Sequence, residues 1–329
     1  MVLLAVNQCQ CGDATVSVEC VTIRDVNSGS LARVLVGFGF NCYQFTAVHR
    51  GEGVECLWAE PGFESGNCRP TGSGIPLMFP FAGRIPGTVF RWEGREYQLT
   101  AGDGRGNALH GFVMNRPWRI LAQTADSVTG VFQASVDDPK ILESWPADFR
   151  ITCTYRIRGC ELDTRVILEN PDTTPLPYGF GTHPYLRVSL GGSPPADCVV
   201  RLPVTESWEL VEMLPTGKRL PVPGADALQR GAPFAQLTLD DIFTGLQFAG
   251  EECVAEICDP GARRSLKIAF DRAFRECVVY TPPHREAICI EPETCVPNAF
   301  ELSRRGLDAG PTVLQPGERV AGRVAMRVE

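Results

Sequence analysis

Two of the four histidines in this chain lie in segments that can present a side chain to a ligand. His110 lies in GNALHGF, where Asn107 and the flanking glycines indicate a bend at a rigid rim. His183 lies in YGFGTHPYLRV, between a glycine-rich approach and a proline that forces extended backbone at the residue before it. Each histidine can transfer a proton near neutral pH or make a structural hydrogen bond, which is the commoner role on a loop. The residue types alone leave both interpretations open.

Aromatic residues surround the second of these histidines. The flat face of an aromatic ring is a surface on which the C–H face of a sugar packs. Three such residues lie within five positions of His183: Tyr178, Phe180 and Tyr185. Binding of a sugar is therefore one interpretation of this segment.

Carboxylates that could complete acid–base chemistry occur in two later segments. In AICIEPETCVPNAF, Glu291 follows an apolar, strand-like run, so it is either a solvated turn residue or a general base held at the end of a strand. Glu293 competes for the same role. In LTLDDIFTGL, Asp240 and Asp241 either cap a turn or supply an acceptor for hydroxyl groups. The sequence does not decide which member of each pair faces a ligand.

The other histidines and a metal site have less support. His49 and His284 lie in turn-like segments without a partner nearby in the sequence, so we expect surface or structural roles for them. Two histidines and one acid form a known zinc ligand set, which His110, His183 and a carboxylate could supply. No HxxxH or HxH spacing brings two ligands onto one element. We therefore expect no metal and no cofactor.

The elements that position these residues are expected to be strands. Glycine (33) and proline (26) interrupt the chain so often that few intervals could hold a long helix. Apolar and polar residues alternate in 149–157, 265–271 and 319–328, and this period of two places one face of a strand in a core. Residues 89–99 have the pattern of a hairpin that turns near Glu93 and Gly94.

The simplest architecture for such strands is an all-β fold, a large antiparallel β-sandwich that forms a single domain over residues 1–329. Hydrophobic residues make up 44% of the chain and charged residues 21%, which is enough apolar material for a sizeable core. No shift in composition marks a linker, and no internal repeat divides the chain.

Charge and cysteine content limit the partners and the compartment. The net charge of −8 has the wrong sign for neutralising phosphates, so nucleic acid is not an expected partner. The N-terminal segment MVLLAVNQCQCGD has too short an apolar run for a signal peptide or an anchor, so we expect a cytoplasmic protein with no membrane partner. The 14 cysteines form no CxxC pair, so we expect most of them to be small, reduced, buried side chains.

Four segments, taken in order, resemble the aldose 1-epimerase (galactose mutarotase-like) family: FPFAGRIPGTVFRWEGREYQL, GNALHGF, ENPDTTPLPYGFGTHPYLRV and CIEPETCVPNAF. They extend from Phe79 to Phe300, about two thirds of the chain. The resemblance implies the family's β-supersandwich and its reaction, which interconverts the α and β anomers of an aldose through transient opening of the pyranose ring. It also implies a small-molecule sugar, an aldohexose, as the partner.

The same resemblance assigns roles to individual residues. Glu291 in CIEP matches the general base that takes the proton of the anomeric hydroxyl, and His183 in THPY matches the general acid that protonates the ring oxygen. His110 in ALHG and Arg84 in GRIP match residues that hydrogen-bond the sugar, and Asp240 in LDDIF matches a substrate-binding carboxylate. Histidine and glutamate start with pKa values near 6.5 and 4.3, so a partly buried pair can work without a metal.

Two departures concern the identity of the sugar. Gly83 precedes Arg84 where galactose mutarotases proper usually have Asn, and Gly111 and Phe112 follow His110 where they have two glycines. The segments are more similar to a broader group of aldose 1-epimerase-like proteins, which includes enzymes for hexose 6-phosphates.

Two other functions remain as alternatives. Arg116 and Arg187, close to the motif histidines, motivate a hexose-6-phosphate mutarotase. A non-catalytic carbohydrate-binding or sugar-sensing protein is also consistent with the fold, because a fold does not fix a function. The acid–base pair disfavours this last alternative, since binding alone needs no such pair.

Overall fold

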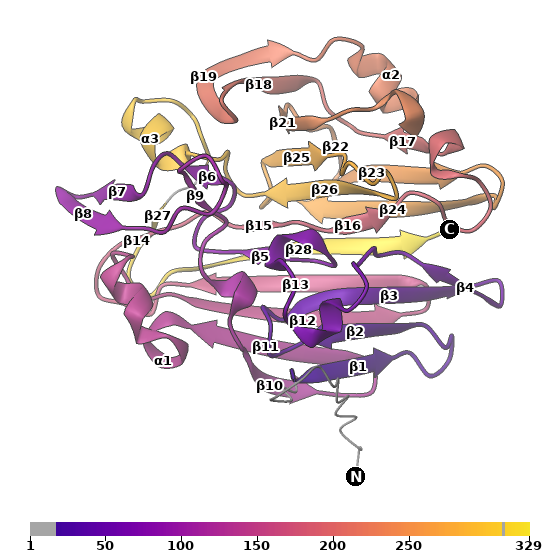
Figure 1. Cartoon of the computed structure of the whole chain (residues 1–329), viewed down its shortest axis with the longest axis horizontal. Helices are drawn as coiled ribbons and strands as arrows, with labels where there is room; N and C mark the ends of the chain where they lie inside the picture. The colour runs from indigo at the N-terminus through magenta and orange to yellow at the C-terminus, as the bar shows by residue number, and fades with distance from the viewer. Residues whose placement is uncertain (1–17, 311–312) are drawn as a thin grey trace.

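The computed structural model describes residues 18–310 and 313–329, and almost all of their regular structure is β-sheet (Figure 1). The N-terminal segment, with Cys9 and Cys11, lies outside these residues. The largest sheet has ten antiparallel strands. In spatial order they are β10 (Arg119–Gln123), β11 (Ser127–Gln133), β12 (Arg150–Arg158), β13 (Glu161–Glu169), β28 (Arg319–Val328), β24 (Arg264–Asp271), β23 (Glu252–Asp259), β17 (Val199–Arg201) and β20 (Ala232–Pro233), with β22 (Phe248–Ala249) paired to β23.

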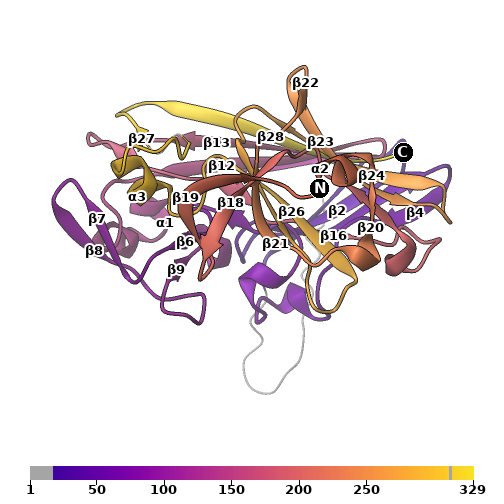
Figure 2. The ribbon, with the colours of Figure 1, turned by 90° about the horizontal axis from the view of Figure 1, so that it is seen from above.

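A second sheet, of eight antiparallel strands, faces the first. In spatial order they are β19 (Leu214–Pro221), β18 (Glu206–Val211), β21 (Asp240–Thr244), β25 (Glu276–Tyr280), β26 (Ala287–Glu293), β15 (Gly181–Thr182) and β5 (Leu77–Met78), with β16 (Tyr185–Arg187) also paired to β26. Seen from above, β13 and β28 lie along one side of the molecule and β21 and β26 along the other (Figure 2).

The remaining strands form a four-stranded sheet and three short ribbons. The four-stranded sheet consists of β1 (Cys20–Arg24), β2 (Leu31–Leu35), β3 (Asn41–His49) and β4 (Glu52–Glu55). The ribbons pair β6 (Arg84–Ile85) with β9 (Ala108–Leu109), β7 (Val89–Trp92) with β8 (Arg95–Gln98), and β14 (Leu176–Pro177) with β27 (Val313–Leu314).

Helices are short and lie between strands. The α-helices are α1 (Ala134–Asp137), α2 (Ala225–Arg230) and α3 (Ala299–Arg304). Single 3₁₀ turns are formed by Phe63–Ser65, Pro70–Gly72, Val113–Asn115, Pro139–Glu143, Pro195–Asp197 and Phe234–Gln236. The all-β, antiparallel sandwich predicted from the sequence is therefore confirmed.

The main hydrophobic core lies between the layers and joins buried side chains of both large sheets, including Tyr155 of β12, Ile268 of β24 and Ile290 of β26. Alternation explains how one strand serves both core and surface. In β12 every second residue from Ile151 is buried, as the sequence predicted. In β28 the same holds from Val324 onward.

The predicted hairpin is also confirmed. β7 and β8 pair from Val89 opposite Gln98 to Trp92 opposite Arg95. Its two turn residues have φ values of 48° at Glu93 and 78° at Gly94, the left-handed region that a tight I′ hairpin turn requires.

The cysteines behave as the composition predicted. The described part of the chain contains twelve, all of them free. Eight are buried: Cys42, Cys56, Cys153, Cys198, Cys253, Cys277, Cys289 and Cys295. Within the described residues no helix is both long enough and apolar enough to cross a membrane.

Candidate active site

One face of β26 carries the acidic side chains of the C-terminal motif. Ile288 and Ile290 belong to the main core. Because side chains alternate along a strand, Cys289, Glu291 and Glu293 project from the opposite face. All three are buried, and the two glutamates are only 2% and 1% exposed. A rigid central strand therefore holds two carboxyl groups on the face of the sheet away from the core.

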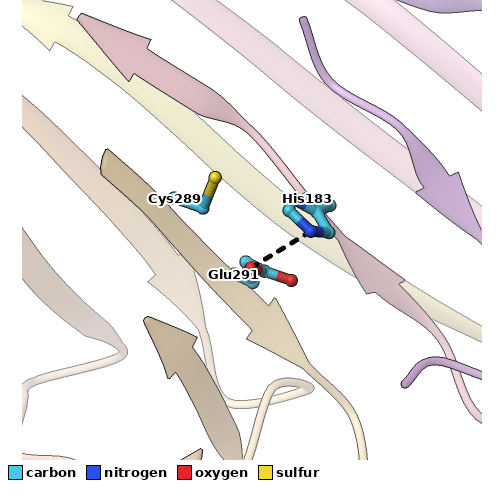
Figure 3. A group of neighbouring side chains, drawn as sticks. All are labelled: His183, Cys289 and Glu291. Carbon is cyan, nitrogen blue, oxygen red and sulfur yellow. Dashed lines mark ion pairs between the residues drawn. The ribbon is translucent and has the colours of Figure 1, made fainter. Parts of the chain in front are cut away.

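His183 lies opposite Glu291 because of strand register. The strands on either side of the histidine, β15 and β16, both pair with β26, and the register is the same in both pairings. The Nε2 atom of His183 lies 3.3 Å from Oε1 of Glu291, and the two side chains point toward one another, His183 from the link between β15 and β16 and Glu291 from β26 (Figure 3). The sheet thus brings together the two residues that the sequence proposed as acid and base.

Burial shifts the pKa values of this pair in opposite directions. It raises the pKa of Glu291 well above its usual value, and the neighbouring carboxyl groups of Glu293 and Asp240 raise it further. Burial lowers the pKa of His183 to about 4. Both effects arise because a buried site disfavours a charged group. Both shifts favour the neutral forms, so at pH values above the pKa of His183 and below that of Glu291 the pair holds one proton, which rests on Glu291. Passing this proton across the 3.3 Å contact to His183 gives the form in which Glu291 can accept a proton.

His110 is fixed against the loop that begins β6. Its backbone has a φ of 61°. Its N–H donates to the carbonyl oxygen of Gly83 (2.9 Å), and the N–H of Gly83 donates to Nδ1 of the imidazole (3.2 Å). Since Nδ1 accepts a hydrogen bond, the proton of the neutral ring is on Nε2. The ring meets that of His183 edge to face, with centroids 5.6 Å apart.

The residue after His110 must be glycine. Gly111 has a φ of 72°, and a Cβ atom there would lie 2.1 Å from the carbonyl oxygen of Phe79. A side chain would therefore push the histidine loop away from the sheet. Burial, followed by the nearby His183, lowers the pKa of His110 well below its usual value, which keeps the ring neutral.

Arg84 is held in place by a network in the next loop. Its Nε donates to Oδ2 of Asp103 (3.2 Å), and Nδ2 of Asn107 donates to the same oxygen (2.8 Å). Burial raises the pKa of Asp103, but hydrogen bonds led by those of Asn107 outweigh this effect and lower it to about 2. Asn107 also accepts from the backbone N–H of Gly87 (3.0 Å). The bend predicted around Asn107 therefore orients the arginine.

The two aspartates of β21 lie on opposite faces of the sheet, and only Asp240 lines the cavity. Asp240 pairs with Tyr280 of β25 and lines the same cavity as the histidines. Asp241 projects from the opposite face because side chains alternate along the strand. Burial raises the pKa of Asp240, and the guanidinium of Arg84 partly opposes this.

All five residues predicted from the sequence line one cavity of about 200 Å³. Its walls contain Arg84, His110, His183, Asp240 and Glu291. Sequence reasoning missed three other polar groups in this wall, Arg69, Thr71 and Tyr280, whereas Glu293, which it considered as the alternative to Glu291, also lies there. A larger hollow of about 510 Å³ lies between the β7–β8 hairpin and α3, but none of the predicted residues lines it.

The prediction that Tyr178 and Phe180 present rings to a ligand is wrong. Both side chains belong to the main core. Side chains alternate along an extended chain, and these two residues fall on the face opposite to that of His183. Tyr185 does line the cavity. Its ring stacks on that of His183, with centroids 5.1 Å apart and planes 4° from parallel, and its hydroxyl donates to the carbonyl oxygen of Thr71 (3.0 Å).

A different set of possible metal ligands appears beside the acid–base pair. Ligand atoms of His183, Cys289 and Glu291 all lie within 4.8 Å of one another. Burial, followed by the charge of Glu291, raises the pKa of Cys289 well above its usual value, so the thiol keeps its proton. Metals bind the thiolate, so an ion at this set would have to displace the proton of Cys289. His110 is not a member of the set.

The other residues singled out in the sequence lie outside this cavity. Nε of Arg116 bonds to Oδ2 of Asp138 (2.9 Å), and Nε of Arg187 donates to a backbone carbonyl oxygen (3.1 Å). His284 stacks on Trp58, with ring centroids 4.1 Å apart. None of them belongs to the cavity wall.

Comparisons with known proteins found a matching family and related sequences. A family model described as aldose 1-epimerase matches residues 57–327. The uncharacterized protein YihR from Escherichia coli (strain K12) is 25% identical over 229 residues, which cover 68% of this chain and 70% of that protein. Galactose mutarotase from Sus scrofa is 29% identical over 150 residues, which cover 44% of this chain and only 41% of that protein.

The fold recurs in solved structures. A galactose mutarotase-like protein from Clostridium acetobutylicum has a TM-score of 0.85 against this chain at 20% sequence identity. The alignment covers 95% of this chain and 96% of that one. At this level of identity, the likeness shows a shared fold.

Proposed function

Since this chain belongs to the aldose 1-epimerase family, we propose that it interconverts the α and β anomers of an aldose by acid–base opening of the sugar ring. The observation that carries this proposal is the 3.3 Å contact between His183 and Glu291 in the wall of a cavity. The two oxygens of a cyclic hemiacetal are bonded to the same carbon. A proton donor and a proton acceptor in one cavity wall can therefore each reach one of them.

In the proposed reaction, Glu291 takes the proton of the hydroxyl at C1 while His183 gives a proton to the ring oxygen. The C1–O5 bond breaks, C1 becomes an aldehyde, and the ring oxygen becomes a hydroxyl. After rotation about the C1–C2 bond, His183 takes that proton back as the oxygen attacks the other face of C1, and Glu291 returns its proton. The pair ends each cycle with the one proton it began with.

The neighbouring groups support orientation and charge stabilisation. Nε2–H of His110 is free to donate, and Arg84 is held by Asp103 so that its other nitrogens remain available. The carboxyl of Asp240, in the same cavity wall, can accept hydrogen bonds from sugar hydroxyls. Fixing the sugar in this way reduces the entropic cost of the reaction.

We propose an uncharged aldose as the substrate in preference to a hexose 6-phosphate. Arg116 and Arg187, which motivated the phosphorylated sugar, are engaged outside the cavity.

Polarimetry tests the proposal. The protein is added to freshly dissolved α-D-glucose, α-D-galactose, a panel of other aldoses and glucose 6-phosphate, and the uncatalysed rate is subtracted. We expect faster mutarotation of at least one uncharged aldose and a slower effect on the phosphate. If no aldose reacts faster while calorimetry detects sugar binding, the chain is a carbohydrate-binding protein instead.

A further inference from the structure

Glu293 is a buried carboxyl group without a complete set of partners. It is 1% exposed and forms part of the cavity wall. Its Oε2 atom is buried and makes no hydrogen bond within the described part of the chain. A buried polar atom left unpaired costs free energy, so such an atom beside a cavity indicates that a ligand completes its bonding.

The surroundings leave room for this side chain. Gly181 lies directly opposite Glu293 in the β15–β26 pairing. A Cβ atom on Gly181 would lie 2.9 Å from Cγ of Glu293 and 2.7 Å from Cε of Met78. Any larger residue at position 181 would therefore displace the carboxyl group from its place.

The position of Glu293 relative to the acid–base pair limits what it can reach. It follows Glu291 by two residues on the same face, which is about 7 Å along a strand. Hydroxyl groups on neighbouring ring carbons are much closer together than this. A sugar whose C1 lies over Glu291 therefore approaches Glu293 with the side of the ring remote from C1.

A second buried glutamate lies next to Glu293 but outside the cavity wall. Glu276 lies opposite Glu293 in the β25–β26 pairing, and its Oε2 accepts a hydrogen bond from Nε1 of Trp208 (2.9 Å). Burial, followed by the charge of Glu276, raises the pKa of Glu293 well above its usual value. A protonated carboxyl can donate one hydrogen bond and accept another, as a sugar hydroxyl also can.

We propose that Glu293 is a substrate-binding residue that hydrogen-bonds the hydroxyl at C3 or C4 of the aldose and so contributes to the choice of sugar. This inference rests on the proposed function. It adds to the acid–base pair a contact that selects among aldoses without taking part in the proton transfers.

The test compares Glu293→Leu, Glu293→Gln and the wild type on the preferred aldose and on its 2-, 3-, 4- and 6-deoxy analogues. We expect Glu293→Leu to lower kcat/KM for the parent sugar roughly tenfold, the effect of losing one hydrogen bond. For one of the 3-deoxy and 4-deoxy analogues, the kcat/KM values of the wild type and Glu293→Leu should be equal, because the hydroxyl that Glu293 would bind is absent. Glu293→Gln should keep most of the activity, since an amide also donates and accepts.

Glu276→Gln is the matched control, because Glu276 is equally buried but lies outside the cavity wall; its profile over the five sugars should be that of the wild type. Circular dichroism and thermal unfolding establish that each variant folds. Three results would contradict the inference. Glu293→Leu could lower kcat/KM equally for every sugar, or it could lower kcat/KM for none. The loss could also disappear only with the 2-deoxy or the 6-deoxy sugar. Calorimetry measures the affinities of the wild type and Glu293→Leu for the same sugars without requiring turnover. If the wild type binds these sugars but does not catalyse their mutarotation, only the proposed reaction is contradicted.

Discussion

Nε2 of His183, between β15 and β16, and Oε1 of Glu291, in β26, lie 3.3 Å apart, although the two residues are far apart in the chain. The contact follows from the register of β15 and β16 against β26, and both side chains are buried. A sheet that is packed on a large core can hold such a pair with little freedom to move. The pair is therefore prepared for proton transfer before a ligand arrives.

Replacing the acid of the pair should slow the reaction while leaving sugar binding largely in place. For His183→Gln we expect kcat to fall by roughly 10²–10⁴-fold, because protonation of the ring oxygen is lost. Polarimetry measures the rate and calorimetry the affinity. If kcat is unchanged and only KM rises, His183 binds the sugar and does not act as the acid.

The pH dependence should reflect a pair that works with one proton. The lowered pKa of His183, about 4, sets the lower limit, because below it the pair takes up a second proton and Glu291 can no longer act as a base. The raised pKa of Glu291 sets the upper limit, because above it the shared proton is lost. We therefore expect kcat/KM to fall on both sides of a plateau, and Glu291→Gln to abolish the high-pH limb of any residual activity. A rate that keeps rising with pH, after correction for the uncatalysed reaction, contradicts this.

Glu276 should make stability depend on pH. Burial raises its pKa to about 7, and the hydrogen bond from Trp208 only partly opposes this. A pKa that is raised in the folded state stabilises the protein at low pH, and this contribution is lost as pH rises from about 4.5 through about 7, by at most about 3 kcal/mol. Denaturant unfolding at pH 5 and pH 8.5 should show Glu276→Gln gaining stability over the wild type only at the higher pH.

The matched control for that measurement is Glu212→Gln, an exposed substitution that should show the same difference from the wild type at both pH values. If Glu276→Gln also behaves in this way, Glu276 does not titrate differently in the folded and unfolded states.

Removal of metals should leave the activity unchanged. His183, Cys289 and Glu291 are close enough to hold an ion, but the proposed reaction uses only the acid–base pair, and without a metal the raised pKa of Cys289 keeps its thiol protonated. We expect full activity after dialysis against EDTA and in Cys289→Ser, whose side chain is of similar size. Loss of activity under both treatments, with recovery on addition of Zn²⁺, would show that the group works as a metal site.

The sequence predicted the main parts of the fold and of the site for identifiable reasons. Alternation identified β12, β24 and β28, because each has one face in the core. The motifs identified Arg84, His110, His183, Asp240 and Glu291, which line one cavity. Their catalytic and binding roles remain predictions.

What the sequence did not provide depends on register and on long-range packing. The choice between Asp240 and Asp241 required the pairing of β21 with β25. Tyr178 and Phe180 were misassigned, although alternation from His183 would have placed them on the core face. Arg69 reaches the cavity from the position just before the 3₁₀ turn Pro70–Gly72, and no local pattern predicts where that turn packs.

The central claim is that Glu291 removes the proton of the anomeric hydroxyl, and one measurement tests it most directly. Mutarotation of the preferred aldose is followed by polarimetry for the wild type and for Glu291→Gln, which has the same shape but cannot accept the proton. We expect kcat to fall by roughly 10²–10⁴-fold with the fold and sugar affinity retained. A Glu291→Gln protein that keeps the wild-type rate would contradict the account.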